Sequence, residues 1–230
     1  MRDWIEFYDS AHSIYVNARH KDVHYRDIAG QIAALVPSPR ARVLDYGCGE
    51  AVHAGMVAAV ASEVVLCDAA ARVRAAIAGR FAGHAKIRAV APEDVERYPD
   101  RSFELIVVNS LVQYLAPAEL DAKLALWRRL LAPDGILIVG DIIPPEVGTL
   151  SDVLALLRYA ASNSFLAAAL SGLVRTAVSP YRKLRTKLRI SRYGETEFLE
   201  ILKAAHFTAE RLPRNLEHNP ARMTFRARLS

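Results

Sequence analysis

The chain has 230 residues, of which 52% are hydrophobic and 24% charged, a composition typical of one globular domain with a well-buried core. Its two cysteines, Cys48 and Cys67, exclude a disulfide framework and a four-cysteine zinc site, so we expect both to be reduced and buried. The N-terminus carries charges where a secretory signal needs an unbroken apolar stretch, and we therefore expect a cytoplasmic protein.

The net charge of +5 is concentrated in one segment. No acidic residue occurs between Asp152 and Glu195, whereas eight lysines and arginines do, so the rest of the chain is mildly acidic. The plain interpretation is the solvated face of a lid helix. The functional one is attraction to an acidic acceptor, a membrane surface or a carrier protein. Nucleic acid is disfavoured, because no recognised nucleic-acid module accompanies the charge.

Strand-like and helix-like segments alternate up to residue 141. Short apolar runs predict strands over residues 42–47, 63–68, 86–91, 103–110 and 135–141. Helical patterns begin near residue 52 and cover 70–81 and 117–131. Continuous apolar strands separated by helices predict a mostly parallel sheet covered on both faces, which is a doubly wound, Rossmann-like α/β fold.

The alternation stops after Asp141. Two prolines within residues 142–146 are followed by a helix-like stretch, which predicts a helical cap inserted after the fifth strand. We expect Tyr159, Phe165 and Tyr193 of this cap to face a pocket. A further helix from residue 195 and two strands joined by the short turn EHNP, residues 217–220, bring the sheet to seven strands.

These elements predict a single domain over residues 1–230. We expect it to comprise four parts: an N-terminal helical cap (1–40), a ligand-binding core (41–141), a basic helical lid (142–193), and a terminal helix with a strand pair (194–230).

The stretch VLDYGCGE, residues 43–50, closes the first predicted strand, where parallel α/β sheets bind ligands. Gly47 and Gly49 allow a ligand to lie against the backbone. The glycine spacing departs from the dinucleotide fingerprint, and Asp45 would repel a pyrophosphate but suits an ammonium or sulfonium group. Asp68, which ends the second strand, can accept both hydroxyls of a ribose. The alternatives are a plain tight turn and, for Asp68, a helix cap.

Four runs in order carry a family resemblance: VLDYGCGE, VVLCDAA, APEDVERYPDRSFELIVVNSLVQYL and LLAPDGILIVGD. Over roughly residues 40–141 they resemble the motifs of class I S-adenosylmethionine-dependent methyltransferases. The resemblance implies that S-adenosylmethionine is the cofactor. It also implies that Asp45, Gly47, Gly49 and Asn109 lie against the methionine part, and that Asp68 holds the ribose.

The adenine contact departs from the family pattern. Pro92 stands where an aspartate is common, so Glu93, Asp94 or the backbone amides beside them are the candidates for this contact.

The acceptor side follows from the chemistry that the resemblance implies. Methyl transfer from a sulfonium needs chiefly alignment and exclusion of water, with a base only where the acceptor loses a proton. The candidates for a base or an acceptor-positioning group are His12, His24, Asp141 and His218. The other candidates for the substrate pocket are Tyr8, Tyr15, Tyr193 and Asn219. For His218 and Asn219 the plain alternative is a polar hairpin turn.

His20 and His24 are spaced i, i+4, which superficially suits a metal. No glutamate completes an H-E-x-x-H pattern, so we expect no metal and interpret the stretch as a helix over the cofactor pocket.

An apolar lid favours a small hydrophobic, aromatic or lipid-like acceptor, and O-methylation is our first hypothesis. The alternatives are N- or C-methylation, and a non-catalytic cofactor-binding module whose basic residues 175–192 bind an acidic partner or a membrane surface.

Overall fold

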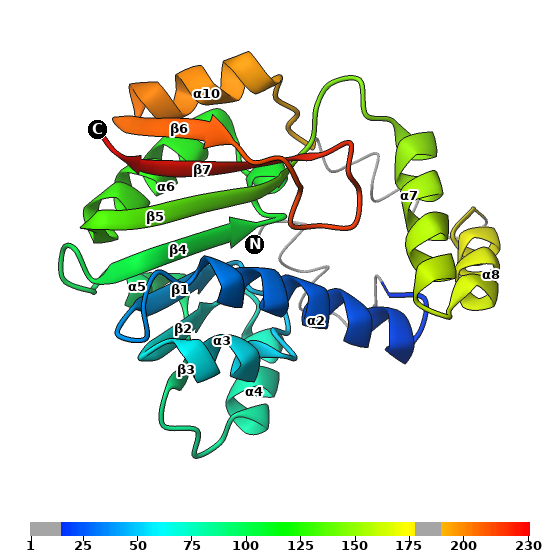
Figure 1. Ribbon diagram of the computed structural model, residues 1–230, viewed down its shortest axis with the longest axis horizontal. Helices are drawn as coiled ribbons and strands as arrows, with labels where there is room; N and C mark the ends of the chain where they lie inside the picture. The colour runs from blue at the N-terminus through cyan, green and yellow to red at the C-terminus, as the bar shows by residue number, and fades with distance from the viewer. Residues whose placement is uncertain (1–14, 178–189) are drawn as a thin grey trace.

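A seven-stranded sheet organises the protein, and the computed structural model describes residues 15–177 and 190–230 of it (Figure 1). The strand order is β3-β2-β1-β4-β5-β7-β6. The strands in chain order are β1 (Arg42–Tyr46), β2 (Glu63–Cys67), β3 (Ile87–Val90), β4 (Phe103–Asn109), β5 (Leu131–Ile142), β6 (Phe207–Arg211) and β7 (Met223–Leu229).

The strands from β3 to β5 are parallel, and β7 pairs antiparallel with both β5 and β6. The apolar residues of the central strands β1 and β4 are buried, as expected in a parallel sheet covered on both faces. This confirms the predicted seven-stranded, mostly parallel fold. The order of β3, β2, β1 and β4 also makes β1 the switch point, so its carboxyl end opens onto a crevice.

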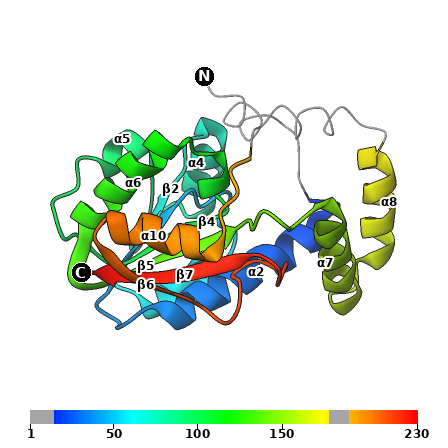
Figure 2. The same ribbon diagram turned by 90° about the horizontal axis from the view of Figure 1, so that it is seen from above.

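Helices cover both faces of the sheet, as the view from above shows (Figure 2). On one face, α2 (Ala18–Leu35), α3 (Ala54–Val60) and α4 (Ala71–Arg80) share a hydrophobic cluster with the strands. On the other face lie α5 (Pro92–Val95), α6 (Pro117–Leu130) and α10 (Glu195–Ala204). A short 3₁₀ turn, η1 (Val112–Tyr114), follows β4.

Two helices stand beyond the sheet, at the carboxyl side of its strands. They are α7 (Thr149–Ser162) and α8 (Leu166–Ala177), and both views show them at the outer end of α2. The helix α2 begins after Asn17, whose side chain accepts a hydrogen bond from the amide of His20 (2.8 Å). Its Val23 packs with Phe165 at the outer end, while its Ile32 packs under the sheet, so α2 joins the two regions.

The end of the chain differs from the predicted hairpin. The strand β6 stops at Arg211, and residues 212–222 form a loop longer than the four-residue EHNP turn. Pro213 has no backbone N–H group to continue the hydrogen bonds between β6 and β7. The Thr224 side chain binds the loop instead. The Thr224 hydroxyl accepts from the Leu216 amide (3.0 Å) and donates to Asn215 (2.8 Å). The loop therefore reaches the carboxyl edge of the sheet with Asn215 and Asn219 buried.

None of the helices in the described parts of the chain has both the length and the apolarity needed to cross a membrane. The two cysteines are buried and unpaired.

Candidate active site

A cavity of about 710 Å³ lies at the carboxyl ends of β1, β2 and β4, beneath α2. The stretch VLDYGCGE forms its floor, and Asp45, Gly47, Gly49, Asp68 and Asn109 all line it. Its volume is within the usual range for a small-molecule or cofactor pocket.

Both glycines of the floor adopt conformations that favour glycine, with φ of +82° at Gly47 and +56° at Gly49. A Cβ added to Gly49 would lie 2.7 Å from the hydroxyl oxygen of Tyr25. That hydroxyl also accepts a hydrogen bond from the amide of Glu50 (2.8 Å). Tyr25 of α2 thus packs directly on the turn, and only glycine fits beneath it.

Two carboxylates face each other across this floor. Asp68 accepts from the amides of Gly49 (3.0 Å) and Ala70 (2.8 Å), which ties the two strand ends together. Burial, with a smaller contribution from Asp68, raises the pKa of Asp45 to about 7. Two partly buried, mutually repelling carboxylates favour a cationic ligand over a phosphate.

The adenine candidates separate in the structure. Pro92 and Glu93 line the cavity, whereas Asp94 does not. The Asp94 carboxylate accepts from the amide of Ala91 (3.2 Å) and pairs with Arg97 (3.0 Å), so it caps the start of α5. Asp94 was therefore the wrong candidate of the two.

Polar side chains at the end of β4 connect this floor to the loop 212–222. The Asn109 amide donates to Oε1 of Glu217 (3.0 Å), and the Ser110 hydroxyl lies within hydrogen-bond distance of the same oxygen (3.3 Å). Glu217 lines the cavity. The loop thereby places a buried carboxylate beside the cofactor-sized space.

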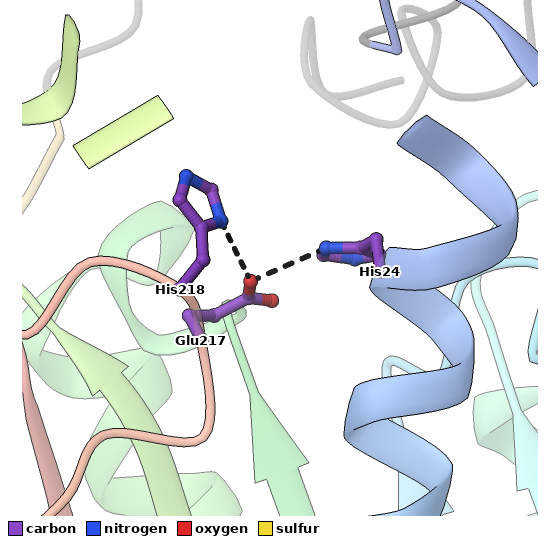
Figure 3. Close-up of side chains that lie close together, drawn as sticks. All are labelled: His24, Glu217 and His218. Carbon is purple, nitrogen blue, oxygen red and sulfur yellow. Dashed lines mark ion pairs between the residues drawn. The ribbon is translucent and has the colours of Figure 1, made fainter. Parts of the chain in front are cut away.

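Two histidine side chains converge on the other oxygen of this carboxylate, Oε2 of Glu217 (Figure 3). The Nδ1 atom of His24 lies 3.4 Å from Glu217 Oε2, and Nδ1 of His218 lies 3.7 Å from it. Burial lowers the pKa of His24, although Glu217 opposes this effect. Burial opposes ionisation of Glu217, but the two histidines and Asn109 outweigh it and hold its pKa low. The Glu217 carboxylate and an unprotonated His24 imidazole are therefore available at neutral pH.

His20 lies against the same cluster. Its ring stacks on Phe165 of the lid region, with ring centroids 4.8 Å apart, and burial lowers its pKa to about 4. It is a neutral, packed histidine at the junction of α2 and α8.

Asp141 and Asn219 do not line the cavity, contrary to their expected roles on the acceptor side. Asp141 is buried, pairs with Arg222 (2.7 Å) and accepts from Ser110 (2.9 Å). Asn219 donates to Asp152 of α7 (2.8 Å). A buried carboxylate such as Asp141 needs hydrogen-bond or ionic partners. These partners form a network that joins the loop to β5 and α7, and both Asp141 and Asn219 belong to it.

The aromatic candidates also divide. Tyr15 lines the cavity, with its ring 5.1 Å from that of His24. Tyr193 is buried in the sheet core, 5.5 Å from the ring of Phe198, so it was wrongly predicted to face the pocket. Tyr8 and His12 lie outside the described residues, as does most of the basic stretch 175–192.

Two residues that line the cavity, Glu217 and Tyr25, were not predicted from the sequence. Glu217 stands in the EHNP stretch, where it reads as a turn residue, and Tyr25 reads as one aromatic among several on α2. The sequence feature that could have indicated Glu217 is its position next to His218, in a turn expected at the carboxyl edge of the sheet. Its partner His24 is too remote in sequence for any spacing rule to join them.

The comparisons with known proteins agree with this geometry. Residues 43–135 match the sequence model of a family described as a methyltransferase domain. A search of curated protein sequences found no significant match.

Solved structures with the same fold cover most of the chain. One is a Burkholderia thailandensis 1,6-didemethyltoxoflavin-N1-methyltransferase with S-adenosylhomocysteine, at 20% identity and a TM-score of 0.58, covering 90% of this chain and 78% of that one. A Synechocystis magnesium protoporphyrin IX methyltransferase has 17% identity and a TM-score of 0.59, covering 99% and 93%. A putative methyltransferase from Haloferax volcanii, solved with its Trm112 activator, has 12% identity and a TM-score of 0.64, covering 100% and 99%.

Proposed function

We propose that this chain, whose residues 43–135 match a methyltransferase domain, is a class I S-adenosylmethionine-dependent methyltransferase that methylates an oxygen atom of a small hydrophobic or aromatic acceptor. The observation that carries the proposal is that the residues expected to bind the cofactor and the residues able to act on an acceptor line the same cavity. Asp45, Asp68 and the glycine turn line the same space as His24 and Glu217.

The residues present fit the cofactor. The cavity that Gly47 and Gly49 line has room for a ligand beside the turn, and the Asp45 and Asp68 carboxylates suit an ammonium group and ribose hydroxyls. We assign the methionine part to Asp45, the glycine turn and Asn109, and the ribose to Asp68. Glu93 is the remaining side-chain candidate for adenine. When bound, S-adenosylmethionine supplies an electrophilic methyl group on a positively charged sulfur.

The acceptor oxygen must lose its proton when it is methylated, and the cluster at Glu217 supplies groups that favour this loss. Of the four candidate bases, His24 and His218 belong to this cluster. Tyr15 and Leu111 add apolar walls to the cavity, which suits a hydrophobic or aromatic acceptor. The acceptors named for the Burkholderia and Synechocystis proteins, 1,6-didemethyltoxoflavin and magnesium protoporphyrin IX, support the small-molecule class. The Burkholderia protein acts on nitrogen, which keeps N-methylation as the alternative.

Cofactor binding is tested by isothermal titration with S-adenosylhomocysteine. We expect saturable binding that is lost in Asp68→Ala and retained in Asp121→Ala, a matched control on the exposed side of α6. Equal affinity in both variants would remove Asp68 from the site, and no binding to the unaltered protein would remove the proposed function.

The methylated atom is tested with a cofactor whose methyl group is deuterated. Phenols, carboxylates, amines and lipids are offered as acceptors, and mass spectrometry identifies the product. We expect a methyl ether or ester. Products confined to amines would contradict O-methylation, and cofactor binding without any product would favour a non-catalytic module.

A lipid-like acceptor has its own support. Leu150 and Leu154 of α7, and Leu166 and Leu170 of α8, are exposed at the outer end of the molecule. The sequence between Asp152 and Glu195 is also free of acidic residues. We propose that these helices contact an anionic membrane surface from which such an acceptor is taken.

A further inference from the structure

The cluster of His24, Glu217 and His218 contains the donor set of a metal site. One candidate ligand atom from each residue lies within 4.8 Å of the other two (Figure 3). The three residues come from two unrelated parts of the fold, since His24 projects from α2 and the other two from the loop 212–222. Two imidazoles and a carboxylate are the ligands that zinc and similar divalent transition metals prefer.

The distances within the cluster argue against a simple hydrogen-bonded pair. The separations of 3.4 Å and 3.7 Å between the histidine Nδ1 atoms and Glu217 Oε2 exceed those of a normal charged hydrogen bond. Two ligands that each lie about 2.1 Å from a tetrahedral ion are about 3.4 Å apart. Both separations between a histidine and the carboxylate are thus close to those of two ligands on one ion, and the third separation is within 4.8 Å.

One of these atoms has a further peculiarity. Nδ1 of His218 is buried and has no hydrogen-bond partner among the described residues. A buried polar atom without a partner is costly, and an ion bound at this position would satisfy it.

Outer contacts hold the three ligands in place. Oε1 of Glu217 is engaged by Asn109 and Ser110, which leaves Oε2 facing the histidines. The His218 ring stacks on Tyr159, with centroids 5.0 Å apart and planes inclined by 21°. The Tyr159 hydroxyl in turn donates to Asp27 of α2 (2.7 Å). Such partners orient ligands in known metal sites.

The position of the cluster connects it with the reaction. His24, Glu217 and His218 also line a small cavity of about 60 Å³, and the first two face the cofactor cavity as well. An ion held by three protein ligands keeps a coordination position open, as catalytic zinc sites do. An acceptor entering from the cofactor side can fill that position with its oxygen.

We propose that His24, Glu217 and His218 bind one divalent transition-metal ion, and that the acceptor's hydroxyl oxygen coordinates this ion as its anion. Coordination lowers the pKa of a bound hydroxyl, so its proton passes to solvent water before the oxygen attacks the methyl group. The oxygen–carbon bond then forms as the carbon–sulfur bond breaks, and the electron pair of that bond stays on the sulfur of the leaving S-adenosylhomocysteine. The acceptor class is accordingly an ionisable hydroxyl such as a phenol or an enol. This second part rests on the proposed function, whereas ion binding does not.

The test is a metal titration of the full-length protein after treatment with a chelator. Zn²⁺ is followed by calorimetry and Co²⁺ by its visible absorption. We expect one ion per chain, with affinity reduced at least about 100-fold in Glu217→Gln and in His218→Ala. His84→Ala removes an exposed histidine outside the cluster and is expected to bind like the unaltered protein. Thermal unfolding followed by circular dichroism checks that each variant is folded.

The outcomes distinguish this inference from the proposed function. No saturable binding, or equal affinity in Glu217→Gln and the unaltered protein, overturns the metal site. Titration of the same samples with S-adenosylhomocysteine is the second measurement. If the protein binds S-adenosylhomocysteine but does not bind the metal, the proposed function survives. The cluster then acts only by accepting the proton of the acceptor. The reverse result leaves the metal site standing without the proposed function.

Discussion

At Gly49, the backbone conformation and a neighbouring side chain both require a residue without a Cβ atom. The residue has φ of +56°, and a Cβ would lie 2.7 Å from the Tyr25 hydroxyl. Gly49→Ala is expected to lower the free energy of unfolding by at least about 1–2 kcal/mol, the cost of the left-handed conformation. It should also weaken S-adenosylhomocysteine binding, because the turn and Tyr25 must separate.

Gly55 provides the matched control for this prediction. It lies in α3, and a Cβ there would meet nothing within 4 Å. Gly55→Ala is expected to leave stability unchanged or raise it by up to about 1 kcal/mol, since alanine favours a helix. Urea denaturation measures both variants, and an equal loss in the two would contradict the argument from the turn.

Asp45 makes cofactor binding dependent on pH. Its pKa is raised to about 7 by burial and by Asp68, and Cys48 also lies near it. The free protein therefore holds a proton on Asp45 below pH 7, whereas a cationic ligand favours the ionised form. Affinity for S-adenosylmethionine is expected to rise with pH up to about 7 and then level off, with release of a proton.

Calorimetry in two buffers of different ionisation enthalpy measures this proton release. In Asp45→Asn the dependence should disappear, and a pH-independent affinity in the unaltered protein would contradict the assignment. The free energy of unfolding depends on pH in the opposite direction from the ligand affinity. Because the folded-state pKa of Asp45 is raised, the ligand-free protein loses stability from this group as pH rises from about 4 to 7.

Arg222 joins the loop 212–222 to both β5 and α7. Arg222 contacts Asp141 at 2.7 Å and Asp152 at 2.8 Å, and its side chain is only 15% exposed. Arg222→Ala leaves both carboxylates without their cation, so we expect it to lower the free energy of unfolding by about 3 kcal/mol or more. Because Glu217 belongs to the same loop, S-adenosylhomocysteine binding should weaken as well.

Arg226 on β7 is the matched control, since its pair with Glu210 is exposed. Removing an exposed pair costs at most about 1 kcal/mol, so Arg226→Ala should unfold at nearly the unaltered urea concentration. If Arg222→Ala matched it, the loop would be held by other contacts.

At the scale of elements, local patterns were sufficient for the strands and for most helices. Residues 43–44 of β1, 64–67 of β2 and 105–108 of β4 are continuous apolar runs, and Pro117 begins α6 where a proline is tolerated in a first helical turn. The loop 212–222 was mispredicted as a strand and a short turn. Its path depends on Thr224 and Arg222, whose partners lie elsewhere in the sheet and in α7.

At the scale of the molecule, α7 and α8 present exposed leucines, with Leu150 71% exposed. We expect the protein to sediment with vesicles containing anionic lipid and to be released by high salt, because the neighbouring sequence is basic. The double variant Leu150→Glu/Leu154→Glu should lose this binding. Val60→Glu alters an exposed apolar residue on α3 and should retain it. Equal binding by both would contradict a role for the α7 face.

The amino-acid sequence by itself determined the parallel sheet, the glycine turn and the pair Asp45 and Asp68. These features depend on short-range patterns, in which strand ends and turn residues are neighbours along the chain. Only the tertiary structure decided which polar residues meet. Asp94, Asp141, Asn219 and Tyr193 are engaged in capping, the buried network and the core, whereas Glu217 joins His24. That meeting requires α2 and the loop 212–222 to pack at one sheet edge, and no local pattern encodes a contact made by folding across the whole domain.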